Sequence, residues 1–282
     1  MDDLKIAITG PNGFVGSNLR RFLSNKKIYL ISLSRKKYKP YKFEKRILFS
    51  DLEQGGLEKK LEGCDVLVHL IGIGAQTADA DYISVNVELT KKILKLCKKA
   101  NIRKIVYISG LGVNNSTTFG YFISKLRAEQ QIINSGIDYT ILRASYIIGK
   151  NDPLTKNLSK QASRGSIMIP GSGKYRLQPI SVNDVSRVIL DCITNKKLSN
   201  KIIDLVGPQT ISFEKFVKRF VKGKKVKIIK TDLEKAYFEA LNNPKNAIYG
   251  LDDLNLLVGD FTSSHKRLEM LCGFKLRMLQ KL

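Results

Sequence analysis

The sequence predicts an α/β protein with a doubly wound parallel sheet and a small mixed α/β subdomain toward its C-terminus. Short apolar runs alternate with amphipathic helical patterns six times within about the first 145 residues, and short turns connect them. This alternation is typical of a parallel sheet covered by helices on both faces. After residue 149 the alternation breaks down, and glycines and prolines that favour turns become frequent.

The expected strands are short apolar runs of the kind that buried parallel strands show. In chain order they cover residues 5–9, 28–33, 47–50, 66–71, 104–109, 139–143 and 202–206. Helical periodicity, with apolar residues three and four positions apart, begins at Phe14 and, further along the chain, covers residues 82–100, 119–135, 182–194 and 212–221. A β-rich stretch at 226–229 precedes a helix whose first residues, Thr231 to Glu234, have the form of a capping box.

Three glycines at every third position, Gly10, Gly13 and Gly16, directly follow the first strand. Glycines at such a strand–turn–helix junction permit a sharp turn, a close approach to a diphosphate and tight packing of helix on strand. The N-terminus of the following helix adds free N–H groups and a positive dipole end. The position of the motif predicts a Rossmann-type dinucleotide site.

The predicted dinucleotide site indicates how the chain is divided into domains. We expect residues 1–149 with 180–207 to form the dinucleotide-binding domain. Residues 150–179 with 208–282 are expected to form a smaller substrate subdomain that covers the ligand edge of the sheet.

Composition excludes several protein classes. The hydrophobic share of 43% is that of a globular protein, and no apolar segment approaches the roughly 18 residues of a membrane span. The chain enters a strand by Leu4, so we expect no signal peptide. The four scattered cysteines and two histidines offer no metal-binding spacing. We therefore expect free thiols, no metal site and a cytoplasmic location.

The formal net charge of +24 is unusual for such a protein. Lysines and arginines concentrate between Lys26 and Arg46 and between Lys215 and Lys230. A surface of this kind attracts anions such as nucleotides, nucleic acid or acidic lipid headgroups. No aromatic–basic interleaving accompanies the charge, so a solvated lysine-rich surface is favoured over a nucleic-acid module.

Tyr121 and Lys125 lie one turn apart on the helix expected at 119–135. A tyrosine titrates near pH 10, and a neighbouring ammonium group lowers that pKa by stabilising the phenolate. Tyr121 could then act as general acid or base while hydride moves to or from a nicotinamide, and Lys125 could bind the nucleotide ribose.

Together these residues resemble the short-chain dehydrogenase/reductase superfamily, in its extended or atypical branch of NAD(P)-dependent epimerase/dehydratase-like proteins. That branch includes the nucleotide-binding accessory subunit of respiratory complex I and its stand-alone prokaryotic relatives. The resemblance covers nearly the whole chain. Its matching segments are Thr9–Gly16, Asp51–Leu52, Val68–Gly72, Asn86–Val87 with Thr90, Tyr107–Ser109, Tyr121–Lys125, Leu142–Ser145, Gln178–Ile180 with Asp184–Val185, Leu256 with Val258–Asp260, and Gly273–Phe274.

The resemblance implies roles for residues of the nucleotide half. The segment from Gly10 to Gly16, with Asn12, Phe14 and Val15, would hold the diphosphate. Asp51 and Leu52 would flank the adenine, and Gly72 would line the path to the nicotinamide. The catalytic residues would be Tyr121 and Lys125.

Two positions depart from the family pattern. The second strand lacks the terminal acidic residue that favours NAD, and Ser34, Arg35 and Lys36 could instead pair with a 2′-phosphate. We therefore expect NADP, with NAD as the alternative. Gly110 occupies the position where related proteins carry a hydroxyl group. Either Ser109 replaces that group, or Ser116 or Thr117 reaches in from the loop, or the group is missing.

Substrate residues are less well specified. Arg143, Ser145, Tyr146, Arg176 and Gln178 lie on segments expected to face the cleft, and Arg176 could bind an anionic group such as the phosphate of a nucleotide-sugar.

Three functions follow from these features. The first is an NADP-dependent oxidoreductase or nucleotide-sugar epimerase/dehydratase. The second is a non-catalytic nucleotide-binding scaffold or assembly subunit, and the third is an RNA- or polyanion-binding protein on the same fold.

Overall fold

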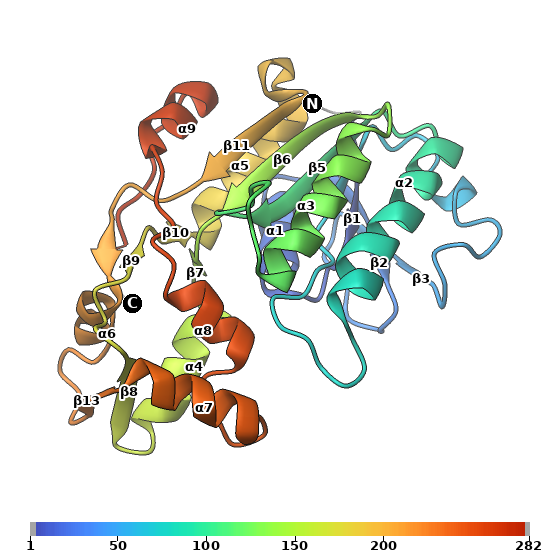
Figure 1. Ribbon diagram of the computed structural model, residues 1–282. Helices are drawn as coiled ribbons and strands as arrows, with labels where there is room; N and C mark the ends of the chain where they lie inside the picture. Colours follow the sequence, from blue (N-terminus) through green and yellow to red (C-terminus); the bar gives the residue numbers. More distant parts are fainter. Residues whose placement is uncertain (1–3, 280–282) are drawn as a thin grey trace.

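The computed structural model describes residues 4–279, with a seven-stranded parallel sheet at the centre (Figure 1). The strands are β1 (Lys5–Thr9), β2 (Tyr29–Ser34), β3 (Glu44–Leu48), β4 (Val66–His69), β5 (Lys104–Gly110), β6 (Asp138–Ala144) and β11 (Lys201–Leu205). Their order across the sheet is β3-β2-β1-β4-β5-β6-β11, which confirms the doubly wound fold. The order reverses between β1 and β4, and such sheets bind ligands at the carboxyl ends of the strands there.

Helices cover both faces of the sheet (Figure 1). They are α2 (Leu89–Lys99) and α3 (Gly120–Ile133) on one face, and α1 (Phe14–Asn25) and α5 (Val182–Thr194) on the other. Ile93 of α2 shares a buried cluster with Leu67 of β4, whereas Leu19 of α1 lies in a second cluster with Val68. Successive strand residues point to opposite faces, so β4 contributes to both clusters.

A smaller group of elements lies beside the carboxyl edge of the sheet (Figure 1). These elements are β7 (Ile147–Ile148), α4 (Pro153–Ala162), β8 (Ser166–Pro170), β9 (Arg176–Leu177), β10 (Ile180–Ser181), β12 (Ile211–Ser212), α6 (Phe213–Phe220), β13 (Lys227–Thr231), α7 (Leu233–Asn242) and α8 (Leu251–Leu257). Most of them share a third buried cluster that includes Phe213, Phe216 and Leu254, whereas Ile180 of β10 lies in the second cluster. The final helix, α9 (His265–Cys272), instead packs Leu268 into the second cluster. The proposed domain boundaries stay a prediction.

Three elements differ in detail from the sequence-based expectation. Strand β3 begins at Glu44, earlier than the expected 47–50, because the carboxylate of this residue is buried and fully hydrogen-bonded. The helix expected at 82–100 opens with a π-helical segment, Ile83–Glu88. Helix α7 begins one residue later than expected, because Asp232 rather than Thr231 accepts the cap hydrogen bond.

The structure shows the state of the cysteines and the surroundings of the other side chains that could bind a metal. All four cysteines are free thiols. Between residues 4 and 279, no three His, Cys, Asp or Glu side chains gather in a way that could hold a metal ion. In the same range, no helix is both long enough and apolar enough to span a membrane.

A buried chain of hydrogen bonds connects β1 to α3. Thr9 Oγ1 lies 2.8 Å from His69 Nδ1, and His69 Nε2 lies 3.1 Å from Thr90 Oγ1. Thr90 donates to the Asn86 carbonyl at 2.7 Å, and the Asn86 amide donates to Ser124 Oγ at 2.9 Å. All five side chains are fully buried. The chain of hydrogen bonds therefore fixes α3 relative to the strand that precedes the glycine turn.

Lys125 on α3 is a buried cation beside this chain of hydrogen bonds. Its Nζ donates to Tyr107 Oη and to the Ile108 carbonyl, each at 3.1 Å. Burial lowers the pKa of Lys125 to about 8, although the Glu129 carboxylate opposes the change. Burial and the Lys125 charge also lower the pKa of His69 to about 3. His69 is therefore neutral at physiological pH.

The lowered pKa of Lys125 predicts how stability depends on pH. Between about pH 8 and 10.5 the unfolded chain keeps a proton on Lys125 that the folded protein has lost, so a rise in pH favours the folded state. From pH 7 to 9.5, the wild type should gain about 2 kcal/mol in unfolding free energy relative to Lys125→Met. Urea unfolding at both pH values measures this difference.

The matched control is Lys99→Met, which removes an exposed lysine from α2. Its stability should follow the wild type at both pH values. Parallel curves for the wild type and Lys125→Met would contradict the assignment of a depressed pKa to Lys125.

Candidate active site

The glycine turn between β1 and α1 has the geometry that a close diphosphate contact needs. Gly10 has a φ of +67°, and a Cβ there would lie 2.9 Å from the carbonyl carbon of Leu70. A Cβ on Gly16 would overlap the Gly10 carbonyl oxygen. The N-cap of α1 is Gly13, which has no side chain that could accept a hydrogen bond from the first N–H groups of the helix. The first turn also contains no acidic residue. The first N–H groups of α1 therefore face the crevice without a competing anion.

A cavity of about 640 Å³ extends from this turn along the carboxyl edge of the sheet. Gly13, Phe14, Val15 and Gly16 line its start, and Ser109 and Tyr121 line its wall further along. Its size is typical of cofactor clefts. The free helix N-terminus at one end and polar side chains at the other fit a nicotinamide dinucleotide.

Gly72 also lines this cavity. A Cβ at Gly72 would lie 2.9 Å from Lys125 Nζ and 3.2 Å from Asn86 Oδ1. A side chain at this position would therefore displace the buried lysine. Lys125 has three N–H donors, of which two are used by Tyr107 and Ile108, so one is left for a ligand.

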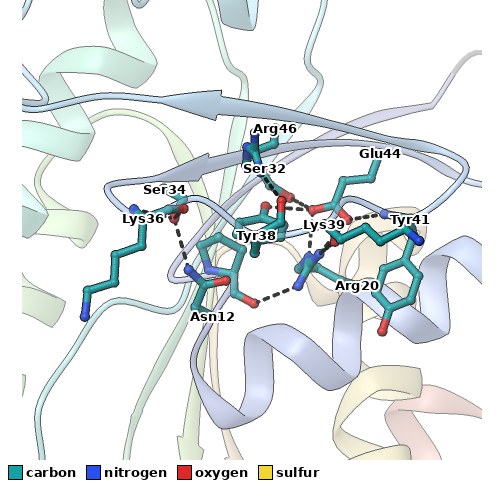
Figure 2. A network of polar contacts seen from close by, with 11 residues as sticks. Asn12, Arg20, Ser32, Ser34, Lys36, Tyr38, Lys39, Tyr41, Glu44 and Arg46 are labelled. Carbon is teal, nitrogen blue, oxygen red and sulfur yellow. Dashed lines mark hydrogen bonds and ion pairs between the residues drawn. The ribbon is translucent and has the colours of Figure 1, made fainter.

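A network of polar contacts fixes the end of β2 (Figure 2). Arg20 donates from Nε and Nη2 to the two carboxylate oxygens of Glu44, at 2.6 and 2.9 Å, and both side chains are buried. Ser32 and Tyr38 also donate to Glu44. Burial opposes ionisation, but the hydrogen bonds from Arg20 and Ser32 hold the pKa of Glu44 below its usual value. Glu44 is therefore an ionised carboxylate whose two oxygens both accept hydrogen bonds.

The glycine turn is tied to β2 by a second contact at the same edge. Asn12 Nδ2 donates to Ser34 Oγ at 3.1 Å, and Ser34 Oγ donates to the Lys36 carbonyl at 2.8 Å (Figure 2). Arg35 and Lys36 are exposed directly after the strand. The two cationic side chains therefore follow the position where a dinucleotide fold binds the adenosine ribose.

Asp51 and Leu52 differ from each other in their surroundings. Asp51 is exposed, and its carboxylate lies 3.3 Å from Lys92 Nζ. The Glu53 backbone N–H and Lys92 hold the pKa of Asp51 below its usual value. Leu52 is buried in the first hydrophobic cluster. Neither residue lines the large cavity, so their contact with an adenine stays a prediction.

Tyr121 and Gly110 are in direct contact. A Cβ at Gly110 would lie 2.9 Å from Tyr121 Cε1, 3.0 Å from Tyr121 Oη and 3.2 Å from Phe122 Cε1. The aromatic rings therefore occupy the space that a hydroxyl-bearing side chain would need. The glycine is what lets the Tyr121 hydroxyl approach the end of β5.

The expectation that Lys125 lowers the pKa of Tyr121 is wrong for this structure. Burial raises the pKa of Tyr121 to about 12, and the Glu129 carboxylate adds to the shift. The Lys125 ammonium instead donates to Tyr107 and to the Ile108 carbonyl. Tyr121 is therefore a protonated phenol at physiological pH.

Ser109 provides an available hydroxyl beside Tyr121. Its side chain is buried and lines the large cavity, and among residues 4–279 its Oγ has no hydrogen-bond partner. An unsatisfied buried hydroxyl is costly unless a ligand completes it. Ser116 is exposed, and neither Ser116 nor Thr117 lines the cavity. Of the three alternatives considered from the sequence, the structure favours Ser109.

The two candidate substrate arginines are both engaged in ion pairs. Arg143 donates to Glu129 at 3.0 and 2.6 Å and lines a separate cavity with Asp204. The structure therefore does not bring Arg143 to Tyr121, because a buried carboxylate on α3 holds its side chain. Arg176 lines a small cavity beside Tyr121, but its Nε donates to Asp260 at 3.0 Å.

Several residues that line the site were not expected from the sequence. Phe122, Leu256 and Phe261 lie against the small cavity, and Asp253 lies against the large one. Phe122 directly follows Tyr121 in the sequence, so its position near the site could have been predicted. Phe261 comes from a segment without clear periodicity, about 140 residues away in sequence, so no local signal indicates its position.

Comparisons with known proteins agree with this geometry. Residues 10–196 match a family model described as NAD(P)H-binding. MoeE5, solved in complex with UDP-glucuronic acid and NAD, superposes with a TM-score of 0.77 at 16% identity, covering 97% of this chain and 94% of that one. At this identity the likeness shows the fold.

Two relatives are similar to this chain in sequence. The mitochondrial 40 kDa subunit of NADH-ubiquinone oxidoreductase from Neurospora crassa is 23% identical over 154 residues, which are 55% of this chain and only 40% of that protein. A Bacillus subtilis protein described as an uncharacterized sugar epimerase is 24% identical over 220 residues, covering 73% of this chain and 96% of that protein. Since the family model matches well over half of the sequence, this chain belongs to the NAD(P)H-binding family.

Proposed function

We propose that the protein is an NADP-dependent oxidoreductase in which Tyr121 donates the proton and Lys125 binds the nucleotide ribose. The observation that carries this proposal is that Tyr121 and the unpartnered Ser109 hydroxyl line the same cavity as the glycine turn. When bound, a reduced nicotinamide supplies a hydride to a carbonyl carbon.

The residues around Tyr121 have distinct tasks in this proposal. The Tyr121 phenol gives its proton to the carbonyl oxygen as negative charge develops there. Ser109 Oγ donates a hydrogen bond to the same oxygen and orients it. The remaining N–H of Lys125 donates to a ribose hydroxyl. Apolar side chains around the cavity exclude water from the reacting groups.

The preference for NADP rests on the residues after β2. Ser34 stands at the strand end, where a carboxylate would favour NAD. The nearby Glu44 cannot serve in its place, since Arg20, Ser32, Tyr38 and the Tyr41 N–H occupy its oxygens. Arg35 is exposed directly after the strand, and we expect it to pair with a 2′-phosphate.

A second candidate function is a nucleotide-binding subunit without turnover. Gly110 favours it, since the hydroxyl expected at this position is missing, and the name of the Neurospora crassa relative describes a subunit of a larger enzyme. Nucleotide-sugar epimerase or dehydratase activity would use the same Tyr121 and Lys125. Polyanion binding stays a prediction from the net charge of +24.

Substitution of Tyr121 by Phe tests the catalytic proposal. Turnover, followed as the loss of NADPH absorbance with carbonyl compounds, should fall by about a hundredfold or more because the proton donor is removed. The affinity for NADPH should change little. Tyr29→Phe, an exposed position at the start of β2, is the matched control. Tight NADPH binding with no turnover by the wild type would support the subunit instead.

Substitution of Arg35 by Ser tests the choice of nucleotide. The Kd for NADPH should rise about tenfold or more, because a charge-assisted hydrogen bond to the 2′-phosphate is lost, while the Kd for NADH should stay the same. Isothermal titration measures both constants. Lys201→Ser removes one exposed charge at the amino end of β11 and should alter neither constant. Equal losses for both nucleotides in Arg35→Ser would refute the assignment.

A further inference from the structure

We propose that the substrate is an uncharged carbonyl compound with one six-membered ring, and that nucleotide-sugars are not substrates. This inference rests on the proposed oxidoreductase function and concerns a small cavity next to Tyr121. The small cavity and the large one share Tyr121, Ala144, Ser145, Tyr146 and Leu256 in their walls. A group in the small cavity therefore lies next to the proton donor.

The walls of the small cavity are mostly apolar. Leu111, Phe122, Leu177, Leu256 and Phe261 all contribute to them. The rings of Phe122 and Phe261 meet edge to face with their centroids 5.1 Å apart. Such walls bind a hydrocarbon group and offer few partners for the hydroxyl groups of a sugar.

The volume of the small cavity is about 150 Å³. An apolar cavity of about this volume, lined by leucine, isoleucine and phenylalanine, binds benzene in another protein. The size therefore fits a single six-membered ring. A uridine diphosphate sugar would need far more room on this side of Tyr121.

Charge argues against a diphosphate substrate. Among the residues of the range 4–279 that line the two cavities, Arg176 is the only cation, whereas Asp152 and Asp253 both line the large cavity. Arg176 is paired with Asp260, whose two carboxylate oxygens accept from its backbone N–H and Nε, at 2.7 and 3.0 Å. Lys125 lies beside Tyr121, but its remaining N–H is assigned to the nucleotide ribose. A substrate diphosphate would therefore have no further unpaired cation among the described residues that line the two cavities.

The reaction at Tyr121 balances as a two-electron reduction. The carbonyl carbon gains a hydride from the reduced nicotinamide, which is oxidised, and a new C–H bond forms. The π pair of the C=O bond moves to the oxygen, and the oxygen takes the Tyr121 proton to form the alcohol. Solvent then returns a proton to the Tyr121 phenolate.

Enlarging the ring pocket tests the proposal. Phe261→Ala removes one aromatic wall, so the ratio of kcat/KM for 2-naphthaldehyde to that for benzaldehyde should rise about tenfold or more, measured with NADPH. Phe238→Ala is the matched control, because Phe238 is 66% exposed on α7 and lines neither cavity. It should leave the ratio unchanged. Thermal unfolding and the Kd for NADPH show whether Phe261→Ala is still folded.

The wild type is also tested with UDP-glucuronic acid and UDP-glucose in the presence of NAD or NADP. We expect no conversion of either nucleotide-sugar. Conversion of one of them, an unchanged aldehyde ratio in Phe261→Ala, or NADPH binding without reduction of any ring aldehyde would overturn the substrate assignment. Failure to bind NADPH at all would instead overturn the proposed function.

Discussion

The candidate site depends on a buried chain of hydrogen bonds from Thr9 to Ser124. It begins at the last residue of β1, directly before the glycine turn, and ends three residues beyond Tyr121 on α3. His69 is its second member, and the neutral ring contacts both Thr9 and Thr90. Because buried polar groups are costly when unpaired, a shift of α3 would break several contacts together. The glycine turn and Tyr121 are therefore fixed relative to each other.

Positive charge is abundant on the protein as a whole but scarce around the cavities beside Tyr121. The protein has a net charge of +24, yet in the part of the chain that the structure describes the cavities beside Tyr121 are lined by a single arginine, which is paired with Asp260. Cations are available near the glycine turn, where Arg35 and Lys36 follow β2, but not at the substrate end. Such an arrangement suits a charged cofactor and a neutral substrate, because each part of the crevice offers partners for one of them.

The fold could be predicted almost completely from local signals. The glycines at 10, 13 and 16 follow a buried strand, and the alternation of apolar runs with helical periodicity gives the doubly wound sheet. The early start of β3 could not be predicted, since Glu44 looks like a surface residue until Arg20 is known to lie beside it. Long-range ion pairs of this kind leave no periodic pattern.

The site was predictable only in part, for the same reason. Tyr121, Lys125 and Ser109 were identified from their spacing and from family resemblance, and the structure places all three beside the crevice. Arg143 was misassigned because its partner Glu129 is buried on another element. The raised pKa of Tyr121 and the apolar pocket around Phe261 depend on tertiary burial, which spacing does not reveal.

The most direct measurement is a crystal structure of the protein with bound NADPH. We expect the diphosphate on the N–H groups that open α1 and the nicotinamide ring next to Ser109 and Tyr121. A diphosphate at the glycine turn with the nicotinamide ring away from both hydroxyls would contradict a catalytic site. That result would identify the dinucleotide as a structural ligand.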